Sequence, residues 1–409
     1  MAIYLLITLD TKADEAWVVR ERLRELGLDV CVVDTGCLGE PPWPAEVTRE
    51  SVFAAAGTSV KEMQNAGDRG QAVTAAALGA ATVVEAAHAA GKLSAVMGLG
   101  GSAGTTIATT AMQRLPIGIP KVMVSTLASG QVRPYVGDKD IVMMNSVVDI
   151  AGMNRISRQI LGNAAAAVAG MVQHRQPAQA DDKRLIAATM FGVTTPCVQH
   201  ARQYLEQAGF EVLVFHATGN GGQAMESLIR EGVIDGVLDV TTTELADELF
   251  GGVLSAGPDR LSAAADVGIP QVVSVGATDM VNFGPRESVP DQFETRQFLV
   301  HNPTVTLMRT TDDENRQIGQ AIGRKVAQSR GPTEVFLPLQ GVSAIDQDGQ
   351  PFDSPSARQR LFEALIENAG TIPCHALDAH INDPSFAQAM AQRLLKLIQS
   401  HKLSNELPS

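Results

Sequence analysis

Residues 94–105 read S-A-V-M-G-L-G-G-S-A-G-T, and this segment is the most informative part of the chain. An apolar run at 95–97 ends in four glycines, and a helix-compatible stretch follows over 105–114. Strand, glycine-rich loop and helix in this order are typical of parallel α/β sheets. Strands and helices alternate along the rest of the chain. We therefore expect an α/β protein of two doubly wound, Rossmann-like subdomains with mainly parallel sheets.

The glycines of this loop predict a ligand contact. Glycine adopts positive φ readily and lets a ligand approach the backbone closely, and a helix start presents free N–H groups to an anion. No lysine follows at P-loop spacing, and the G-x-G-x-x-G spacing is absent, so the ligand stays unnamed. The alternative is a tight turn with close helix–strand packing. The expected ligand-binding residues are Gly98, Gly100, Gly101, Ser102, Gly104 and Thr105.

The two halves of the chain contain matching segments in the same order. E-L-G-L-D-V-C-V-V-D at 25–34 parallels Q-A-G-F-E-V-L-V-F-H at 207–216, and G-I-P-K-V-M-V-S at 118–125 parallels G-I-P-Q-V-V-S-V at 268–275. These matches predict a duplicated α/β unit, although general βαβ patterning could produce part of the similarity.

A polar, proline-containing stretch, Q-P-A-Q-A-D-D at 176–182, separates the two halves. We read it as a linker between an N-terminal domain, 1–178, and a C-terminal domain, 179–409. The length of 409 residues allows each domain its own hydrophobic core.

The composition of the chain limits the kinds of molecule that we expect it to bind. The net charge is −13 and aromatic residues make up 4% of the chain, which disfavours nucleic-acid binding. The four cysteines form no C-x-x-C pair or metal-ligand spacing, so we expect no metal site and a reducing, cytoplasmic location. The alanine-rich stretch at 70–90 contains Glu85 and His88 and is only weakly hydrophobic, so we expect no membrane span. We expect a homo-oligomer, a dimer.

Polar residues follow the first two expected strands, 3–9 and 30–33. Asp10, Thr11 and Lys12 could hold a phosphate or carboxylate, or form a solvated turn that caps a helix. Asp34 could bond a ribose hydroxyl, as an acidic residue at this place does in dinucleotide folds.

The second half offers its own candidates. His216, at an expected strand end, could act as a general acid or base, or simply bond a neighbouring turn. Arg286 or Arg296 could clamp a carboxylate or phosphate through two hydrogen bonds. The catalytic candidates are His216, Lys12 and Arg296. The remaining expected ligand contacts are Thr218, Gly219, Gly221, Gly222, Thr242, Asn282 and His301. Thr242 could equally be a helix-cap residue, and Asn302, the neighbour of His301, could equally be a turn residue.

Several longer motifs together resemble one family. They are D-T-G-C-L-G (34–39), G-D-R (67–69), H-A-T-G-N-G-G-Q-A-M-E (216–226), N-F-G-P (282–285), H-N-P-T-V-T-L-M-R-T-T (301–311) and P-L-Q-G-V-S-A-I-D (338–346), besides the glycine loop. They resemble the Tm-one-like ATP-binding domain family, long known only as an uncharacterised protein family. The resemblance implies two α/β subdomains and a site for ATP, with Mg, at the glycine loop.

These observations lead to one expected function and two alternatives. We expect a nucleotide or another phosphorylated or carboxylated metabolite to bind in an interdomain cleft that both glycine loops face. The first alternative is an enzyme of acid-sugar or phosphosugar metabolism. The second is a non-catalytic, ligand-dependent protein-interaction module.

Overall fold

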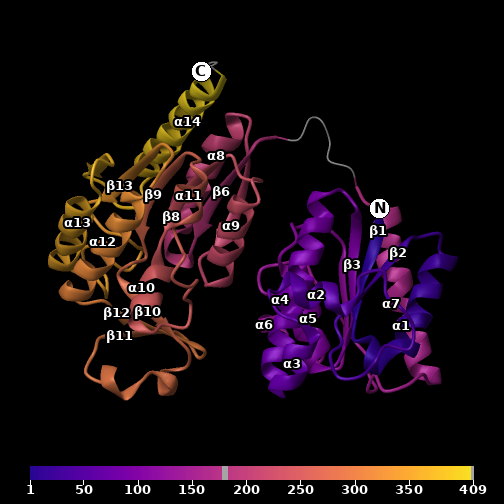
Figure 1. Ribbon diagram of the computed structural model, residues 1–409. Helices are drawn as coiled ribbons and strands as arrows, with labels where there is room; N and C mark the ends of the chain where they lie inside the picture. Colours follow the sequence, from indigo (N-terminus) through magenta and orange to yellow (C-terminus); the bar gives the residue numbers. More distant parts are fainter. Residues whose placement is uncertain (177–182, 407–409) are drawn as a thin grey trace. The chain divides into compact units, whose positions relative to one another are not determined.

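A computed structural model describes residues 1–176 and 183–406 (Figure 1). The chain forms two compact units, Met1–Ala178 and Gln179–Ser409, and each is described by itself. Apart from its first residue, the linker expected at 176–182 lies outside the described residues.

The first unit is built on a parallel five-stranded sheet in the order β2-β1-β3-β4-β5. Its alternating apolar residues serve two cores: Ile3 and Leu5 face one side of the sheet, and Tyr4 and Leu6 face the other. The strands are β1 (Ala2–Ile7), β2 (Val30–Asp34), β3 (Leu93–Gly100), β4 (Lys121–Ser125) and β5 (Val142–Asn145).

Helices cover both faces of this sheet, which makes the unit doubly wound. One face packs against α1 (Leu9–Glu25) and α7 (Arg155–Gln173). The other packs against α2 (Arg49–Ala55), α3 (Val60–Ala66), α4 (Arg69–Ala89) and α5 (Ser102–Gln113), with the short α6 (Arg133–Val136) beside α5.

Helix α4 is the only described helix long and apolar enough to cross a membrane by length and composition. Its small residues, among them Ala76, Ala80 and Val84, are buried in the first unit's core against the sheet. The Asp68 side chain caps this helix by accepting from the amides of Gly70 and Gln71.

The second unit contains a parallel six-stranded sheet in the order β14-β13-β9-β8-β6-β7. An antiparallel sheet of order β10-β12-β11 accompanies it, which the sequence patterns did not predict. The strands are β6 (Leu185–Met190), β7 (Glu211–His216), β8 (Gly236–Thr241), β9 (Gln271–Gly276), β10 (Met280–Phe283), β11 (Phe298–Asn302), β12 (Val305–Arg309), β13 (Thr333–Pro338) and β14 (Cys374–Leu377).

Helices again cover both faces of the parallel sheet. One face packs against α8 (Thr195–Gln207) and α14 (Pro384–Glu406). The other packs against α9 (Asn220–Arg230), α10 (Thr243–Phe250), α11 (Ala263–Val267), α12 (Asp312–Ala327) and α13 (Pro355–Asn368). Short 3-10 turns lie at Gly192–Thr194, Arg286–Ser288 and Asp291–Phe293.

The two parallel sheets have the same strand order over five strands. Counted inward from the edge strands β2 and β7, the order β2-β1-β3-β4-β5 in the first sheet corresponds to β7-β6-β8-β9-β13 in the second. The matching segments at 25–34 and 207–216 therefore end in equivalent edge strands, and those at 118–125 and 268–275 end in equivalent strands β4 and β9. The expected α/β class with two mainly parallel, Rossmann-like sheets is confirmed.

Two local expectations were wrong. The segment 98–100 belongs to β3, because its backbone continues to pair with β4 as far as Gly100 and Ser125. Asp10, Thr11 and Lys12 lie in the first turns of α1 instead of a loop, and Lys12 marks a kink there with φ −137°.

Candidate anion-binding site

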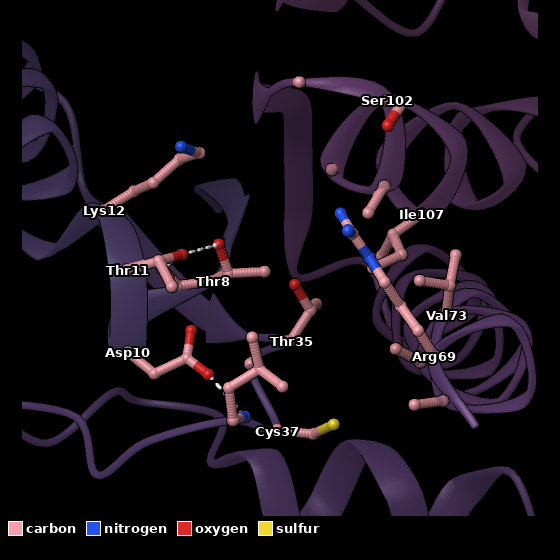
Figure 2. A pocket seen from close by; sticks show the side chains of 17 residues that line it. Thr8, Asp10, Thr11, Lys12, Thr35, Cys37, Arg69, Val73, Ser102 and Ile107 are labelled. Atoms are coloured by element: carbon pink, nitrogen blue, oxygen red, sulfur yellow. Dashed lines mark hydrogen bonds between the residues drawn. The ribbon is translucent and has the colours of Figure 1, made fainter. Parts of the chain in front are cut away.

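A cavity of about 340 Å³ lies at the carboxyl ends of the first unit's strands (Figure 2). Helices α1 and α5 follow the neighbouring strands β1 and β3 but cover opposite faces of the sheet. Such a switch point leaves a crevice where ligands bind in open α/β sheets. The lining residues are Thr8, Asp10, Thr11, Lys12, Thr35, Gly36, Cys37, Leu38, Arg69, Ala72, Val73, Ala76, Gly101, Ser102, Ala103, Gly104 and Ile107.

The start of α5 forms one wall of this cavity. Gly101 is the N-cap residue, and no described side chain caps the helix. The first amide that bonds back to the cap is that of Thr105, at 2.8 Å from the Gly101 carbonyl oxygen. The preceding first-turn amides, from Ser102 to Gly104, therefore remain available, and the positive end of the helix dipole favours an anion there.

The glycines of this segment act mainly through close packing. None of Gly98, Gly100, Gly101 and Gly104 has positive φ, contrary to our expectation. A Cβ on Gly98 would lie 2.4 Å from Ala108 Cβ, and one on Gly104 would lie 2.9 Å from the Leu99 carbonyl oxygen. At Gly101 the nearest atom would be Thr126 Oγ1 at 3.7 Å, so only this position has room for a side chain. Close packing therefore accounts for Gly98 and Gly104, whereas a ligand contact stays a prediction for Gly101.

Three residues expected to contact the ligand lie behind the cavity wall. Gly98 and Gly100 belong to β3, and neither lines the cavity. Thr105 is buried, and its hydroxyl donates to the Gly101 carbonyl oxygen and lies 2.6 Å from Ser125 Oγ. Thr105 thus fixes the helix start from within.

Two cationic side chains line the cavity. Arg69, at the first position of α4, is exposed, makes no ion pair with another described residue, and points into the cavity in Figure 2. Lys12 Nζ donates to the Ile150 carbonyl oxygen at 2.5 Å, which holds it at the cavity edge. Sequence reasoning missed Arg69, although G-D-R at 67–69 was part of the family resemblance and Arg69 directly follows a helix cap.

Asp10 organises the floor of the cavity. Its Oδ2 atom accepts from the amides of Leu38 at 2.7 Å and Gly39 at 3.2 Å, whereas its buried Oδ1 atom has no described partner. Thr11 lines the cavity beside it, and its hydroxyl lies 2.8 Å from that of Thr8. Asp10 and Thr11 are thus at the site where the sequence placed them, on a helix and not on a loop.

Asp34 has a structural role that differs from the expected ribose contact. Its carboxylate is buried and accepts from the amides of Leu9 at 3.0 Å and Gly36 at 2.9 Å, so it stabilises the start of α1. Burial raises the pKa of this carboxyl, and the two amide hydrogen bonds oppose that shift.

The remaining wall is largely apolar. Ala72, Val73 and Ala76 of α4 and Ile107 of α5 form it, and Cys37 lies at its edge. Burial and the neighbouring Asp10 carboxylate both raise the pKa of the Cys37 thiol, so it is not an activated nucleophile. This combination of an apolar wall and an uncapped helix start suits a ligand with a flat or aliphatic part next to an acidic group.

The second glycine-rich loop is occupied by the chain's own carboxylate. Glu244 Oε1 accepts from the amides of Gly219 at 2.7 Å and Gly222 at 3.1 Å. A Cβ on Gly222 would lie 2.2 Å from Glu244 Oε2, and one on Gly221 would lie 1.9 Å from the His216 carbonyl oxygen. This loop follows β7, the equivalent of β2, so it does not correspond in topology to the loop after β3. The expected external anion is replaced here by Glu244.

A buried ion cluster holds Glu244 in place. The fully buried Arg260 donates from Nε to Glu244 Oε2 at 2.6 Å and pairs through both Nη atoms with Asp239. Glu226 Oε1 lies 3.4 Å from Arg260 Nη1 and accepts from the amide of Leu261, and Glu226 Oε2 accepts from the amide of Ala263 at the start of α11. Burial raises the pKa of Glu244, and Arg260 opposes that shift. The cluster is a structural centre of the second unit.

Loops also cover the carboxyl end of β6, the equivalent of β1. The amide of Ala344 donates to the Val193 carbonyl oxygen at 3.0 Å, and so does Asn382 Nδ2 at 2.9 Å. Asn382 Oδ1 accepts from the amide of Cys197 in the first turn of α8. The chain itself thus supplies partners that a ligand could provide at this place.

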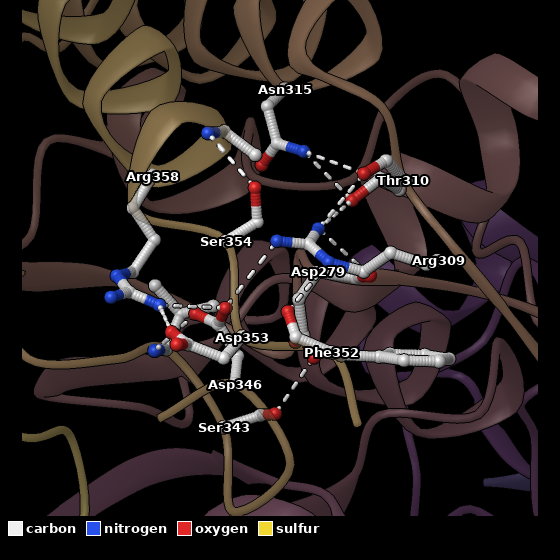
Figure 3. A network of polar contacts seen from close by, with 12 residues as sticks. Asp279, Arg309, Thr310, Asn315, Ser343, Asp346, Phe352, Asp353, Ser354 and Arg358 are labelled. Atoms are coloured by element: carbon white, nitrogen blue, oxygen red, sulfur yellow. Dashed lines mark hydrogen bonds and ion pairs between the residues drawn. The ribbon is translucent and has the colours of Figure 1, made fainter. Parts of the chain in front are cut away.

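A second buried network lies beside these loops (Figure 3). Asp346 Oδ1 accepts from Arg309 Nη2 at 3.3 Å and from Arg358 Nη1 at 2.9 Å. Ser343 Oγ donates to Asp279 Oδ2 at 2.8 Å, while Asp279 Oδ1 is buried without a described partner. Burial and the Asp346 carboxylate raise the pKa of Asp279 to about 7.

The other candidates of the second unit are dispersed. Arg296 is paired with both carboxylate oxygens of Glu314, at 2.8 and 2.5 Å, so it is not free to clamp an anion. His216 is exposed at the end of edge strand β7, with its ring 5.6 Å from that of Phe191. His301 is exposed on β11. None of them lines the first unit's cavity.

The polar candidates of the second unit make internal contacts. Thr242 is buried and donates to the Ser274 carbonyl oxygen. Asn282 is buried and donates from its backbone amide and from Nδ2 to the Asp247 carboxylate. Thr218 Oγ1 donates to the His216 carbonyl oxygen at 3.3 Å. Their hydrogen bonds stabilise turns and strands of this unit.

Comparison with known proteins identifies the family of this chain. The family model described as "Uncharacterised protein family (UPF0261) N-terminal domain" matches residues 1–177, and the family model of the C-terminal domain matches residues 183–398. The chain belongs to the UPF0261 family. A UPF0261 protein of Clostridium tetani is 50% identical over 399 residues, which cover 97% of this chain and 99% of that protein.

A plant relative extends the family beyond bacteria. The ToMV resistance protein Tm-1(GCR237) of Solanum lycopersicum is 44% identical over 337 residues, or 80% of this UPF0261 chain. The match spans 45% of the tomato protein, less than half its length. Among solved structures, the glycosyltransferase SnogD from Streptomyces nogalater covers 97% of this chain at 10% identity with a TM-score of 0.19.

Proposed function

We propose that the first unit of this UPF0261 protein binds a phosphorylated or carboxylated small molecule, with an ATP-like nucleotide as the leading ligand class. The observation that carries this proposal is the uncapped start of α5, which opens into the cavity at the switch point between β1 and β3. A helix start with free amides is a ready anion site.

The charges and shape of the cavity support the same ligand class. Arg69 offers a guanidinium for a bidentate contact with a phosphate or carboxylate, and Lys12 adds a second cation at the edge. The apolar wall of α4 and α5 suits a base or an acyl part of the ligand. Within residues 1–176 and 183–406 no group of three His, Cys, Asp or Glu could hold a metal ion. Mg²⁺ is usually bound through substrate phosphates together with one or two carboxylates, so we propose that it would enter with the phosphates of a nucleotide.

Of the three catalytic candidates, only Lys12 lines this cavity. An acid-sugar or phosphosugar enzyme would consequently need Lys12, Asp10 or the ligand's own groups for proton transfer. Binding without turnover would instead favour a ligand-dependent interaction module. The two alternatives differ in whether the bound ligand is converted.

Isothermal titration calorimetry of the full chain tests the proposal. The probes are Mg·ATP, inorganic phosphate and ribose 5-phosphate, each followed by mass spectrometry for turnover. We expect Arg69→Ala to lower the affinity for whichever probe binds wild type about tenfold or more, because a charge-assisted hydrogen bond is lost. Arg158→Ala, an exposed arginine on α7, is the matched control. Equal affinity in Arg69→Ala and wild type would contradict the proposal.

A further inference from the structure

A second hollow, of about 370 Å³, lies at the carboxyl ends of β4 and β5 in the first unit. Its lining comes from Asn145, the last residue of β5, and from the turns directly after β4 and β5. The residues are Thr126, Ser129, Asn145, Ser146, Val147, Val148 and Asp149. None of them was singled out by sequence reasoning, because the segment contains no motif of known chemistry.

Hydrogen-bonding groups in this hollow lack partners within the described chain. The hydroxyls of Thr126 and Ser129 make no side-chain hydrogen bond to another described residue. Asn145 Oδ1 accepts from the amide of Val147 at 3.0 Å, which leaves the Asn145 amide group free to donate. Two hydroxyls and one carboxamide therefore face the hollow with unused hydrogen-bonding capacity.

The wall of the hollow also contains a strained residue. Val147 has φ of +63° and the residue is 71% exposed, so burial in a core does not offset the cost of this backbone conformation. A β-branched residue rarely adopts this conformation, and such strain concentrates at functional sites. The turn is held by Ser146, whose hydroxyl donates to the Val148 carbonyl oxygen at 2.7 Å. The fold thus keeps this wall in a fixed shape.

The two cavities of this unit differ in the charge of their lining residues. The hollow contains no lysine or arginine among its lining residues, and Asp149 contributes a carboxylate. A phosphate would be repelled here, whereas sugar hydroxyls can both donate to a carboxylate and accept from an amide or hydroxyl. The cationic groups, Lys12 and Arg69, line the first cavity instead.

The two cavities are close to each other. Thr126 lines the hollow, and its Oγ1 atom lies 3.7 Å from the place that a Cβ on Gly101 would take. Gly101 lines the first cavity. Lys12 Nζ bonds the carbonyl oxygen of Ile150, the neighbour of Asp149. A ligand anchored at the start of α5 therefore needs to extend only past Thr126 to reach the hollow.

We propose that the hollow lined by Thr126, Ser129, Asn145 and Asp149 binds the neutral, hydroxyl-rich part of the ligand, a furanose or pyranose ring. This inference rests on the proposed function, in which the acidic group binds at the start of α5. Together they specify the ligand as a sugar phosphate or a nucleotide whose sugar lies over Thr126.

The test compares ligands with and without a sugar. Calorimetry measures the affinity of the full chain for inorganic phosphate, ribose 5-phosphate and glucose 1-phosphate. It is done with wild type and with the double variant Thr126→Val/Ser129→Ala. We expect the double variant to weaken at least one sugar phosphate about tenfold, since it loses two hydrogen bonds, and to leave inorganic phosphate unchanged. Thr82→Val, an exposed threonine on α4, is the control for the added valine. Asn145→Ala, with Asn163→Ala as its control, repeats the test through another side chain.

The outcomes separate this inference from the proposed function. If sugar phosphates bind and Gly101→Val abolishes that binding, but the variants of the hollow bind them as wild type does, the sugar subsite is wrong and the anion site stands. If no probe binds wild type, or if Gly101→Val leaves all affinities unchanged, both proposals are wrong. Circular dichroism confirms that each variant is folded.

Discussion

Glu244 Oε1 lies 2.7 Å from the amide nitrogen of Gly219, so the second unit fills its own glycine-rich loop with a carboxylate. The first unit leaves the start of α5 uncapped and open to a cavity. Two units that share the order of five parallel strands thus differ in whether a glycine-rich segment is left open or is filled by the chain's own carboxylate. This contrast is why we assign ligand binding to the first unit.

Removing the Glu244 carboxylate should destabilise the second unit strongly. Glu244→Ala leaves the buried Arg260 with fewer partners and the amides of Gly219 and Gly222 with none from this side chain. We expect a loss of about 3–5 kcal/mol in the free energy of unfolding, measured by urea denaturation. Glu21→Ala, which breaks an exposed ion pair with Arg24, should cost about 0–1 kcal/mol. Equal losses in the two variants would show that the cluster is not structural.

The glycines of 98–104 should respond differently to alanine. Gly98→Ala places a Cβ 2.4 Å from that of Ala108, so we expect a loss of about 1–3 kcal/mol from overpacking. Gly101→Ala meets its nearest atom at 3.7 Å with an ordinary φ of −82°, so its stability should stay within about 0.5 kcal/mol of wild type. Thermal unfolding of both variants checks this order, and a reversed order would rule out the packing role of Gly98.

Features encoded by neighbouring residues could be predicted from the sequence. The Asp68 cap of α4 and the Thr311–Glu314 capping box of α12 can be recognised from the residue types and their spacing, because both partners lie within one helical turn. The Ser354 cap followed by Pro355 likewise begins α13. The parallel α/β class followed from the alternation of strands and helices, which is also a local pattern.

Features that depend on distant contacts could not be predicted. Nothing near Gly219 indicates that Glu244, 25 residues later, accepts its amide hydrogen bond. The antiparallel pairing of β10 with β12 joins residues separated by a long loop. Arg69 reaches the cavity only because α4 begins beside α5. The sequence therefore placed Gly101 and Ser102 in a segment that lines the cavity, but it gave no means of separating them from Gly98 or Asp34, which do not line it.

Stability should depend on pH through a buried carboxyl of the second unit. Burial and Asp346 raise the pKa of Asp279 from 3.8 to about 7, so between about pH 4 and pH 7 the folded chain holds a proton that the unfolded chain has released. The stability that this group contributes therefore falls as pH rises through that window. The free energy of unfolding of wild type minus that of Asp279→Asn should fall by up to about 1.4 kcal/mol per pH unit, measured by urea denaturation at several pH values. If this difference in the free energy of unfolding does not change with pH, Asp279 does not hold a proton in the folded chain over this range.

Cys37 should report on occupancy of the cavity. Its raised pKa predicts slow alkylation by iodoacetamide near pH 7 that accelerates as pH rises toward 9. Because Cys37 lines the cavity, a bound ligand should slow the reaction, whereas Cys374, outside it, should react at an unchanged rate. Peptide mass spectrometry with and without Mg·ATP or ribose 5-phosphate measures both rates. Protection of both thiols alike would point to a global effect and against a local site.

The most direct test of the anion site is calorimetric binding of Mg·ATP and ribose 5-phosphate to Gly101→Val. The valine side chain would project toward Thr126 and into the space beside the free amides of α5, without requiring positive φ. Gly162→Val, at an open position on α7, is the matched control. We predict that Gly101→Val keeps its circular dichroism spectrum and loses the binding that wild type and Gly162→Val show. Unchanged affinity in folded Gly101→Val would contradict the account, and the start of α5 would then be a packing element alone.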